Sequence, residues 1–456
     1  MPGGRAPGVL IIVQNLPVPL DRRVWLECLA LRDAGYRVSV VCPRGPGEAA
    51  HEELDGVRLY KYAPPPPARG LLGYLLEFGY CWWRTAWLSV RVRRRHGFDV
   101  LQACNPPDTY WALAALWRPW GVRFVFDQHD LNPELFRSRF GEPSGPPARA
   151  QLAALLFLER MTYRLAHHVV VTNESYRAVA TRRGRLPAGR TTVVRSGPDT
   201  ARMRPLPGRP ELRAGARHLL AYVGIMGPQD GIDVLLRIMH HLVHRIGRTD
   251  VHLVLMGFGD VLDDMRRYAA DLGLGDAVTF TGRVGPPEIA DHLSTACLGL
   301  CPDLRTPLND VSTMNKTMEY MAHALPVVAF DLLETRRSAA GAAVYVPSGD
   351  EAAFAEAVAA LLDDPERRRA MGVAARTRCA TELDWQPQAE AYVGVFDDLV
   401  GRPDAARRRA PAWPAVDRRR PGSPGRPPVL GGREAVDLRQ PGALARYVVS
   451  RGIDAG

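Results

Sequence analysis

The residues NKTMEYMA at 315–322, followed by LPVVAF at 325–330, predict a short helix that leads into a buried β-strand. Lys316 and Glu319 stand one helical turn apart, so they share a face of this helix. Lysine is rare here: of 59 Lys and Arg residues, only Lys61 and Lys316 are lysines. Since a compact ammonium and a carboxylate suit phosphate and sugar hydroxyl groups, this pair indicates a binding site. An ordinary surface ion pair is the alternative.

Short β-branched runs alternate with longer amphipathic segments on both sides of this stretch, which is typical of parallel sheets covered by helices. The alternation occurs twice, and a Pro-rich polar stretch at 200–216 separates the two series. The predicted strands are 9–13, 38–42, 57–60, 100–103, 124–127, 169–172 and 192–195 in the first series, and 219–224, 251–256, 278–281, 298–301, 326–330 and 343–346 in the second. We therefore predict an α/β protein of two doubly wound, Rossmann-like domains, residues 1–200 and 201–385, that face a central cleft.

The C-terminal residues 401–456 are predicted not to fold as the two domains do. Residues 401–456 contain twelve arginines against five acidic residues, which accounts for +7 of the net charge of +10. The many Pro and Gly residues and the low apolar content of this tail predict disorder. Because the first 400 residues are nearly neutral, no nucleic-acid partner is expected.

The cysteines indicate the compartment. The seven cysteines form no CxxC pair and lie mostly in apolar runs, so we expect reduced, buried thiols in a cytoplasmic protein, and no zinc site. No secretory signal is visible near the start of the sequence.

Residues 71–95 raise the question of a membrane. The segment is rich in Leu and Trp, but Glu77, Arg84 and Arg91 recur at intervals of seven. This pattern fits a helix lying on an anionic membrane surface better than a membrane-spanning helix. A helix packed within the first domain is the alternative.

A dinucleotide site is not indicated, although doubly wound sheets often hold one. The first strand is followed by QNLPVP at 14–19, which lacks glycine, and MGFGD at 256–260 lacks the third glycine of the fingerprint. Gly257 and Gly259 remain candidates for close approach to a phosphate.

Several motifs in fixed order carry a resemblance to a known family. They are DRRVW at 21–25, CNPPDT at 104–109, DQHDLNPELF at 127–136, VVRSGPD at 193–199, YVGIMGPQDGID at 222–233, MGFGD, FTGR at 280–283 and NKTMEYMA with LPVV. Over residues 9 to 400 the chain resembles the retaining glycosyltransferases of family 4, which have the GT-B fold. NPPDT, MGPQDG and NKxxEYM resemble the subgroup that assembles bacterial surface polysaccharides and lipid-linked oligosaccharides.

The resemblance implies an acceptor-side first domain and a nucleotide-sugar-binding second domain. It further implies a helix at 386–400 that packs back toward the first domain.

Glu319 matches the second glutamate of the family's EX7E motif and would hold the ribose hydroxyls, whereas Val311 stands where the first glutamate is expected. The family's Arg and Lys for the donor diphosphate are Ile225 and Asp230 here. We infer that Lys316 replaces them. The other donor-site candidates are Ser312, Asn315, Gly227, Gly257 and Gly259.

His129 follows a predicted strand at the place where the family has a histidine near the donor sugar, so His129 and Lys316 are the catalytic candidates. The acceptor-side candidates are Asn15, Asp21, Arg22, Asn105, Asp108 and Asp130, although Asp21 could equally be a helix cap. We expect neither a metal nor another cofactor.

The predicted function is that of a metal-independent, retaining hexosyl- or N-acetylhexosaminyltransferase. It would move a sugar from a UDP- or GDP-sugar to a saccharide or lipid-linked acceptor in surface polysaccharide biosynthesis, at the inner face of the membrane. A catalytically weak GT-B scaffold and a GT-B sugar-nucleotide epimerase are the alternatives.

Overall fold

The computed structural model describes residues 5–65 and 70–402, together with two short antiparallel strands, β15 (Val429–Leu430) and β16 (Arg433–Glu434). The chain divides into two compact units, which are described separately. Unit 1 contains the described residues up to 196 and those from 386 to 402, and unit 2 contains residues 197–385. The predicted disordered tail, 401–456, lies almost entirely outside the described residues.

Unit 1 is built on an eight-stranded sheet in the order β3-β4-β2-β1-β5-β6-β7-β8. All neighbouring pairs are parallel except β3 with β4. Every residue of β1 and β5 is buried, as expected for parallel strands covered on both faces. The strands are β1 (Gly8–Ile12), β2 (Arg37–Pro43), β3 (His51–Leu54), β4 (Val57–Tyr62), β5 (Val100–Cys104), β6 (Arg123–Gln128), β7 (His168–Val171) and β8 (Thr191–Val193).

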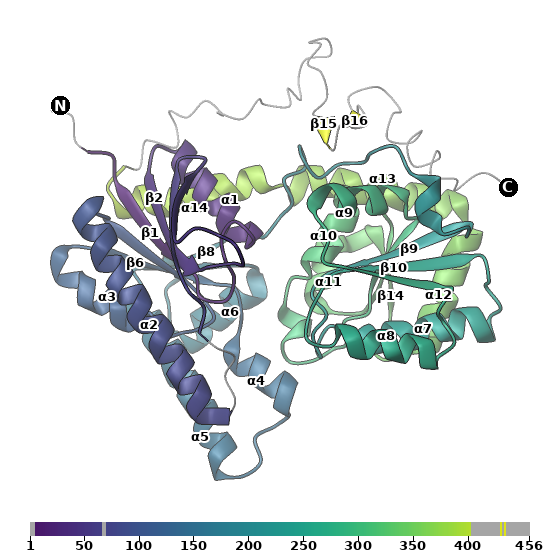
Figure 1. The fold of residues 1–456 in the computed structure, drawn as a ribbon, viewed down its shortest axis with the longest axis horizontal. Coiled ribbons are helices and arrows are strands. Elements are labelled where there is room, and N and C mark those ends of the chain that lie inside the picture. The colour runs from purple at the N-terminus through teal and green to yellow at the C-terminus, as the bar shows by residue number, and fades with distance from the viewer. Residues whose placement is uncertain (1–4, 66–69, 403–428, 431–432, 435–456) are drawn as a thin grey trace. The chain divides into compact units, whose positions relative to one another are not determined.

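Helices cover both faces of this sheet. Helices α1 and α14 lie on one face, and α2, α3 and α5 lie on the other (Figure 1). This division follows from right-handed crossovers, because the chain steps one way along the sheet through α1 and the other way through α2, α3 and α5. The helices are α1 (Arg22–Asp33), α2 (Gly70–Arg95), α3 (Trp111–Trp117), η1 (Arg118–Trp120), α4 (Asn132–Phe140), α5 (Pro146–Leu165), α6 (Glu174–Arg183), η2 (Ala188–Arg190) and α14 (Trp385–Leu399).

Unit 2 contains a six-stranded, entirely parallel sheet in the order β11-β10-β9-β12-β13-β14. Numbered within the unit, this order is 3-2-1-4-5-6, the doubly wound arrangement of a Rossmann fold. The strands are β9 (His218–Val223), β10 (Val251–Met256), β11 (Val278–Gly282), β12 (Leu298–Cys301), β13 (Val327–Phe330) and β14 (Ala343–Val346). The α/β, doubly wound prediction is therefore confirmed.

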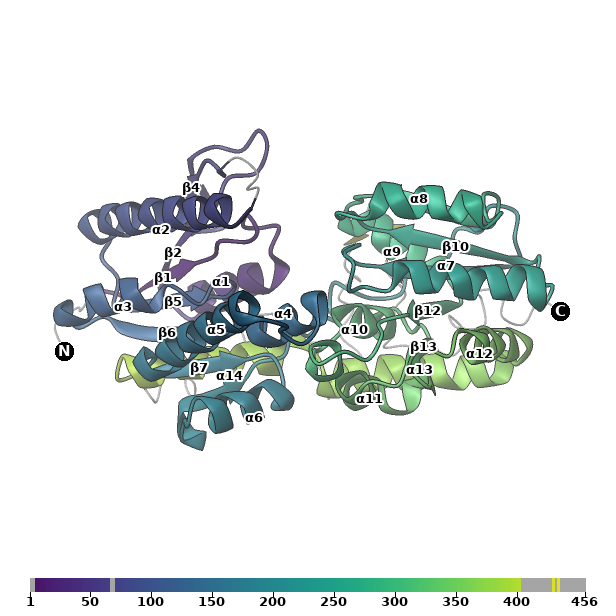
Figure 2. The same cartoon turned by 90° about the horizontal axis from the view of Figure 1, so that it is seen from below.

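Two hydrophobic clusters pack on the two faces of this second sheet. One joins the strands to α7 and α12, and the other joins them to α9, α10 and α13; Figure 2 shows the same helices from below. The helices are η3 (Pro210–Arg213), α7 (Ile232–His240), η4 (His241–Arg245), α8 (Leu262–Asp271), α9 (Pro286–Thr295), η5 (Asn309–Val311), α10 (Asn315–Ala322), α11 (Leu333–Ala339), η6 (Ala340–Ala342), α12 (Glu351–Asp363) and α13 (Pro365–Glu382).

Within the described residues, no helix is both long enough and apolar enough to cross a membrane. The segment predicted at 71–95 forms α2, and it carries an exposed apolar stripe that is considered below.

Candidate active site

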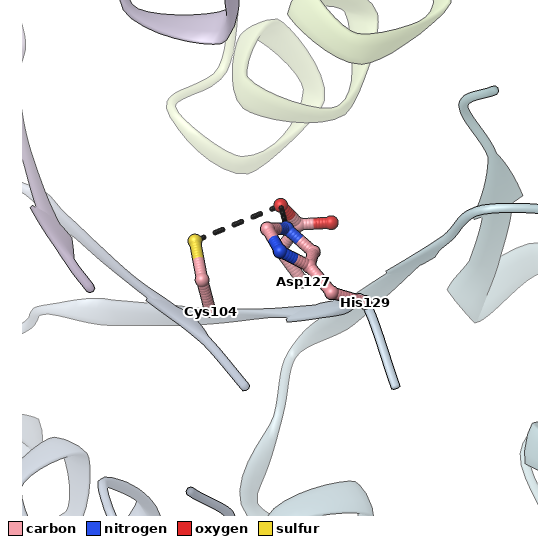
Figure 3. Close-up of side chains that lie close together, drawn as sticks. All are labelled: Cys104, Asp127 and His129. Atoms are coloured by element: carbon pink, nitrogen blue, oxygen red, sulfur yellow. Dashed lines mark hydrogen bonds and ion pairs between the residues drawn. The ribbon is translucent and has the colours of Figure 1, made fainter. Parts of the chain in front are cut away.

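In unit 1, the carboxyl ends of β5 and β6 bring three polar side chains together. Cys104 is the last residue of β5, Asp127 is the penultimate residue of β6, and His129 is the first residue after β6. Figure 3 shows these side chains facing one another: His129 Nε2 lies 2.6 Å from Asp127 Oδ2, and Cys104 Sγ lies 3.7 Å from the same oxygen. Asp127 is fully buried, whereas the side chain of His129 is 14% exposed. The imidazole is thus the accessible end of the group.

Arg23, on α1, completes a buried ion cluster around Asp127. Its guanidinium donates to both carboxylate oxygens of Asp127, at 2.9 and 3.4 Å, and its Nε lies 3.0 Å from Glu27 Oε1. The remaining nitrogen donates to the Val194 carbonyl at 2.7 Å and to Ser196 Oγ at 3.1 Å. Arg23 therefore joins α1, β6 and the segment after β8.

The cluster sets the charge of His129. Burial alone would lower the pKa of this imidazole, but the neighbouring Asp127 carboxylate raises it to about 9. Burial opposes ionisation of Asp127, yet the charges of Arg23 and His129 hold its pKa well below the ordinary value. For Glu27, burial and the charge of Asp127 raise the pKa. At neutral pH, His129 is therefore an imidazolium held by an ionised aspartate.

The shift in His129 links stability to pH. Since its pKa is higher in the folded state, the ion pair contributes stability that is fully present below about pH 6.5, the ordinary histidine value. That contribution is lost as the pH rises through about 9.

Cys104, Asp127 and His129 have the composition of a metal site, because their ligand atoms lie within 4.8 Å of one another. Two observations disfavour a metal there. Arg23 already contacts the Asp127 carboxylate and lies 3.2 Å from His129 Nε2, so a divalent ion would face a guanidinium. Burial raises the pKa of the Cys104 thiol well above its ordinary value, which makes a thiolate ligand costly.

The predicted acceptor-side residues Asn105 and Asp108 shape the loop that carries His129. Asn105 Oδ1 accepts from the backbone amides of His129 and Asp130 at 2.7 and 3.1 Å, and its Nδ2 donates to Asp108 at 3.0 Å. Asp108 also accepts from Asn132 Nδ2 at 2.6 Å, and burial raises its pKa to about 6. Both residues are buried and organise the loop, so the structure brings them next to His129 without exposing them.

The remaining acceptor-side candidates differ in their surroundings. Asp21 is the N-cap of α1 and accepts from the Val24 amide at 3.1 Å. Its side chain therefore caps the helix, as the alternative interpretation predicted. Asn15 is exposed in the loop after β1, and Arg22 and Asp130 are half-buried.

In unit 2, Lys316 lies at the start of α10 and is 9% exposed. Its Nζ donates to Asp303 Oδ1 at 2.7 Å and lies 4.9 Å from the centre of the Tyr222 ring. Burial opposes the ammonium charge, but the Asp303 carboxylate raises the pKa of Lys316 well above its ordinary value. The ion pair of Lys316 with Asp303 is therefore buried, with the two side chains 9% and 2% exposed, and is not an ordinary surface pair.

Lys316 also lies beside the loop that follows β9. A Cβ atom placed on Gly224 would be 3.4 Å from the Cε of Lys316. Ile225 is the next residue of this loop and is 51% exposed. The aliphatic part of the Lys316 side chain therefore lies beside the loop after β9. In this loop Ile225 and Asp230 stand in place of the family's arginine and lysine.

The candidate glycines have a structural reason to be glycine. A Cβ on Gly257 would fall 1.8 Å from the Gly224 carbonyl oxygen, and one on Gly259 would fall 2.4 Å from the Met226 oxygen. The loop after β10 therefore packs directly on the loop after β9. The Gly227 amide donates to Asp230 Oδ2 at 2.9 Å, so in this structure a carboxylate already occupies that donor.

The other donor-side candidates lie in and before α10. Asn315 is exposed at the first position of this helix, and Glu319 is half-buried one turn later. Ser312 donates to the Leu308 carbonyl at 2.8 Å. The structure brings Asn315, Lys316 and Glu319 onto one short helix, as the sequence pattern predicts.

Two important partners were missed from sequence. Asp303 lies two residues after the carboxyl end of β12. Because ligands of doubly wound sheets bind at this edge, its position after a predicted strand could have identified Asp303 as a candidate site residue. Glu27 gives no comparable signal, because it lies within an amphipathic helix and its neighbour Asp127 is 100 residues away in the chain.

The chain thus has two Rossmann-like units, each with a buried polar centre at the carboxyl ends of its strands, and comparisons with known proteins identify its family. A family model described as a glycosyl transferase 4-like domain matches residues 20–197, and one described as glycosyl transferases group 1 matches residues 217–364. The chain belongs to glycosyltransferase family 4 and has the GT-B fold. It is a glycosyltransferase that uses a nucleotide-sugar donor.

Individual relatives agree with this assignment. The chain is 27% identical over 430 residues to D-inositol 3-phosphate glycosyltransferase of Kineococcus radiotolerans, covering 87% of this chain and 92% of the relative. It is 31% identical to a GDP-mannose-dependent phosphatidylinositol monomannoside mannosyltransferase of Mycobacterium tuberculosis, over 48% of this chain and 58% of that enzyme. These relatives give no support to the scaffold or epimerase alternatives.

Solved structures show the same fold. Sucrose-phosphate synthase from Thermosynechococcus elongatus superposes with a TM-score of 0.70 at 20% identity, covering 87% of this chain and all of that one. HepE of Anabaena in complex with UDP-glucose superposes with a TM-score of 0.66 at 14% identity, covering 86% of this chain and 99% of that one.

Proposed function

We propose that this glycosyltransferase is retaining and metal-independent, and that it transfers a hexose or N-acetylhexosamine from a UDP- or GDP-sugar. The observation that carries the proposal is the position of Lys316, a buried ammonium that contacts the loop after β9 in the nucleotide-binding unit. The retaining outcome is supported by the resemblance to family 4.

Lys316 is the proposed ligand of the donor diphosphate. The leaving nucleoside diphosphate gains negative charge as the glycosidic bond breaks, and a preorganised cation stabilises that charge. Asp303 holds the ammonium in place at 2.7 Å, so little reorganisation is needed when the donor binds. Glu319, one turn further along α10, supplies a carboxylate for the ribose hydroxyls. Ser312, Asn315 and the glycines of the adjoining loops complete the proposed donor site.

His129 is the proposed contact with the transferred sugar. Its Nε2 is engaged by Asp127, and the side chain keeps 14% of its surface accessible. As an imidazolium it offers a charged donor to an oxygen that becomes more negative during the transfer. Because Arg23 and Lys316 supply positive charge in the two polar centres, the proposed mechanism requires neither a metal nor another cofactor.

The acceptor is proposed to be a saccharide or a lipid-linked glycan of a surface polysaccharide. The motifs NPPDT, MGPQDG and NKxxEYM support this class of acceptor. The two relatives are named for an inositol phosphate and for a phosphatidylinositol mannoside, which are polyol and lipid-linked acceptors.

A membrane surface is the proposed place of the reaction. Leu76, Trp83, Trp87 and Val90 form an exposed stripe along α2, and the two indoles are 58% and 48% exposed. The Arg84 guanidinium lies within 6.0 Å of the centres of both indole rings. Apolar side chains flanked by arginines match the acyl boundary and the head groups of an anionic bilayer.

Thermal-shift measurements with UDP, GDP and their hexose conjugates, in the presence of EDTA, test the proposed donor. One nucleotide should raise the Tm of the protein, and the corresponding sugar conjugate should raise it as well. If none of these compounds changes the Tm, the proposed donor site is wrong.

A further inference from the structure

Helix α14 (Trp385–Leu399) lies outside both family matches, which end at residues 197 and 364. It nevertheless belongs to unit 1, where it packs on the same face of the sheet as α1. Tyr392 and Phe396 of this helix are completely buried, and their rings lie 4.9 Å apart. The C-terminal part of the chain therefore contributes to the interior of the unit that holds His129.

A continuous set of buried hydrogen bonds runs from this helix to His129. Tyr392 Oη donates to Gln102 Oε1 at 2.6 Å. The amide nitrogen of Gln102 donates to Glu27 Oε2 at 2.9 Å and to Asp127 Oδ2 at 3.3 Å. The same Asp127 oxygen lies 2.6 Å from His129 Nε2. Tyr392, Gln102, Glu27 and Asp127 all have zero relative exposure.

The tyrosine determines which way the Gln102 amide points. Burial raises the pKa of Tyr392 well above its ordinary value, so the phenol keeps its proton and can donate it to the Gln102 oxygen. This bond holds the oxygen of Gln102 toward Tyr392 and its NH2 group toward Glu27 and Asp127. The opposite orientation would place an amide oxygen against two carboxyl groups, which is unfavourable in a buried site.

We propose that Tyr392 is a positioning residue for His129, because it fixes the Gln102 amide that holds Asp127 against the imidazole. This proposal rests on the proposed function in one respect: the contact of His129 with the transferred sugar is taken from there. The positioning itself is a property of unit 1 and does not depend on a donor or an acceptor.

Other charged groups also face His129 and must stay unchanged in a test. Asp127 contributes from β6, Arg23 and Glu27 from α1, and Asp21 from the residue before α1. Asp130 follows His129 in the loop. Tyr392 contacts none of these groups by a hydrogen bond; its bond is to Gln102, so a change at Tyr392 reaches His129 through that amide.

The test is a histidine-labelled NMR titration of the full chain, with His129→Gln used to identify the His129 signal. Tyr392→Phe removes the hydroxyl and keeps the ring. Without a fixed Gln102 donor, the Asp127 carboxylate becomes more basic, so the His129 pKa should rise by about half a unit.

The matched control is Tyr36→Phe. Tyr36 is also buried, and it donates to Asp397 of the same helix at 2.7 Å, but it is not part of the hydrogen-bond set that reaches His129. This variant should leave the His129 pKa unchanged while losing an equivalent helix contact.

Two results would overturn the proposal: no rise of the His129 pKa in Tyr392→Phe, or an equal rise in Tyr36→Phe. If Tyr392→Phe does not fold, Gln102→Met provides the same test, because it removes the amide and leaves Tyr392 in place. No sugar donor enters the measurement, so a protein without transferase activity can still confirm or refute the positioning role.

Discussion

Replacing Lys316 by alanine separates a role in donor binding from a role in stability. The side chain is 9% exposed, and its Nζ is 2.7 Å from Asp303 Oδ1. The substitution removes the ammonium and leaves a carboxylate that is only 2% exposed without its cation. Two losses are therefore expected, one in the free energy of unfolding and one in nucleotide affinity.

The magnitude of each loss follows from the geometry. Breaking one partner of a buried ion pair costs about 3–5 kcal/mol of stability. A charged hydrogen bond to the diphosphate is worth about 1.5–3 kcal/mol. At about 1.4 kcal/mol per tenfold change, the Kd for the nucleoside diphosphate should rise roughly 10- to 150-fold.

Isothermal titration calorimetry with UDP and GDP measures the affinity, and urea unfolding measures the stability. Lys61→Ala is the matched control, because Lys61 is the other lysine of the chain, is 3% exposed and pairs with Glu48 and Glu52 at 2.8 and 2.6 Å. It should lose stability without losing affinity. Asp303→Asn should lower the affinity less than Lys316→Ala does, since it keeps the lysine and removes only the carboxylate that positions it. A folded Lys316→Ala protein that binds nucleotide as tightly as the wild type would refute the assignment.

Further outcomes follow from the same contacts. Between pH 6.5 and 9, the stability of the wild type relative to His129→Gln should fall by up to about 3 kcal/mol in urea unfolding, because the imidazolium loses its proton. Replacing Trp83 and Trp87 together by serine should weaken sedimentation with phosphatidylglycerol vesicles at least about tenfold, since both exposed indoles lose their apolar contact. Gly257→Ala should lower the free energy of unfolding by about 2–3 kcal/mol, because its Cβ would lie 1.8 Å from a carbonyl oxygen, whereas Gly275→Ala, with no atom within 4 Å, should not.

Each of these outcomes has a contrary result. A stability difference independent of pH would show that His129 is not held as an imidazolium. Leu333→Ser, at another exposed apolar residue, in unit 2, should leave vesicle binding intact, and an equal loss there would argue against a specific role of α2. Equal stability of the two alanine variants would contradict the close packing of the loops after β9 and β10.

The fold could be predicted because parallel strands buried on both faces leave a local signature. Each of the thirteen predicted strands is present in the structure, with ends that differ by at most two residues. In the sheets of the two units, the strand that was missed is β3 (His51–Leu54), which reads HEEL and pairs antiparallel at the edge of its sheet. An exposed edge strand has neither the apolar run nor the alternation on which the prediction relied.

The candidate site was only partly predictable, because its pairings join distant parts of the chain. The rarity of lysine identified Lys316, but its partner Asp303 lies 13 residues earlier, before a loop that contains η5 (Asn309–Val311). Arg23 and Asp127 are 104 residues apart, so only the folded sheet brings them together. The glycines at 257 and 259 are predicted from sequence to approach a phosphate, and the structure adds a reason for glycine that the sequence does not show, the close packing of the loops after β9 and β10.

The most direct test is the hydrolysis of UDP- and GDP-hexoses by the full chain in EDTA, in which water takes the sugar and nucleoside diphosphate is released, compared among the wild type, Lys316→Ala and Lys61→Ala. The account predicts release by the wild type and Lys61→Ala from one of the two donor classes, and a loss of at least tenfold in kcat/KM for Lys316→Ala, at about 1.4 kcal/mol per tenfold. Release that requires added metal, or that survives the loss of Lys316 unchanged, would contradict it.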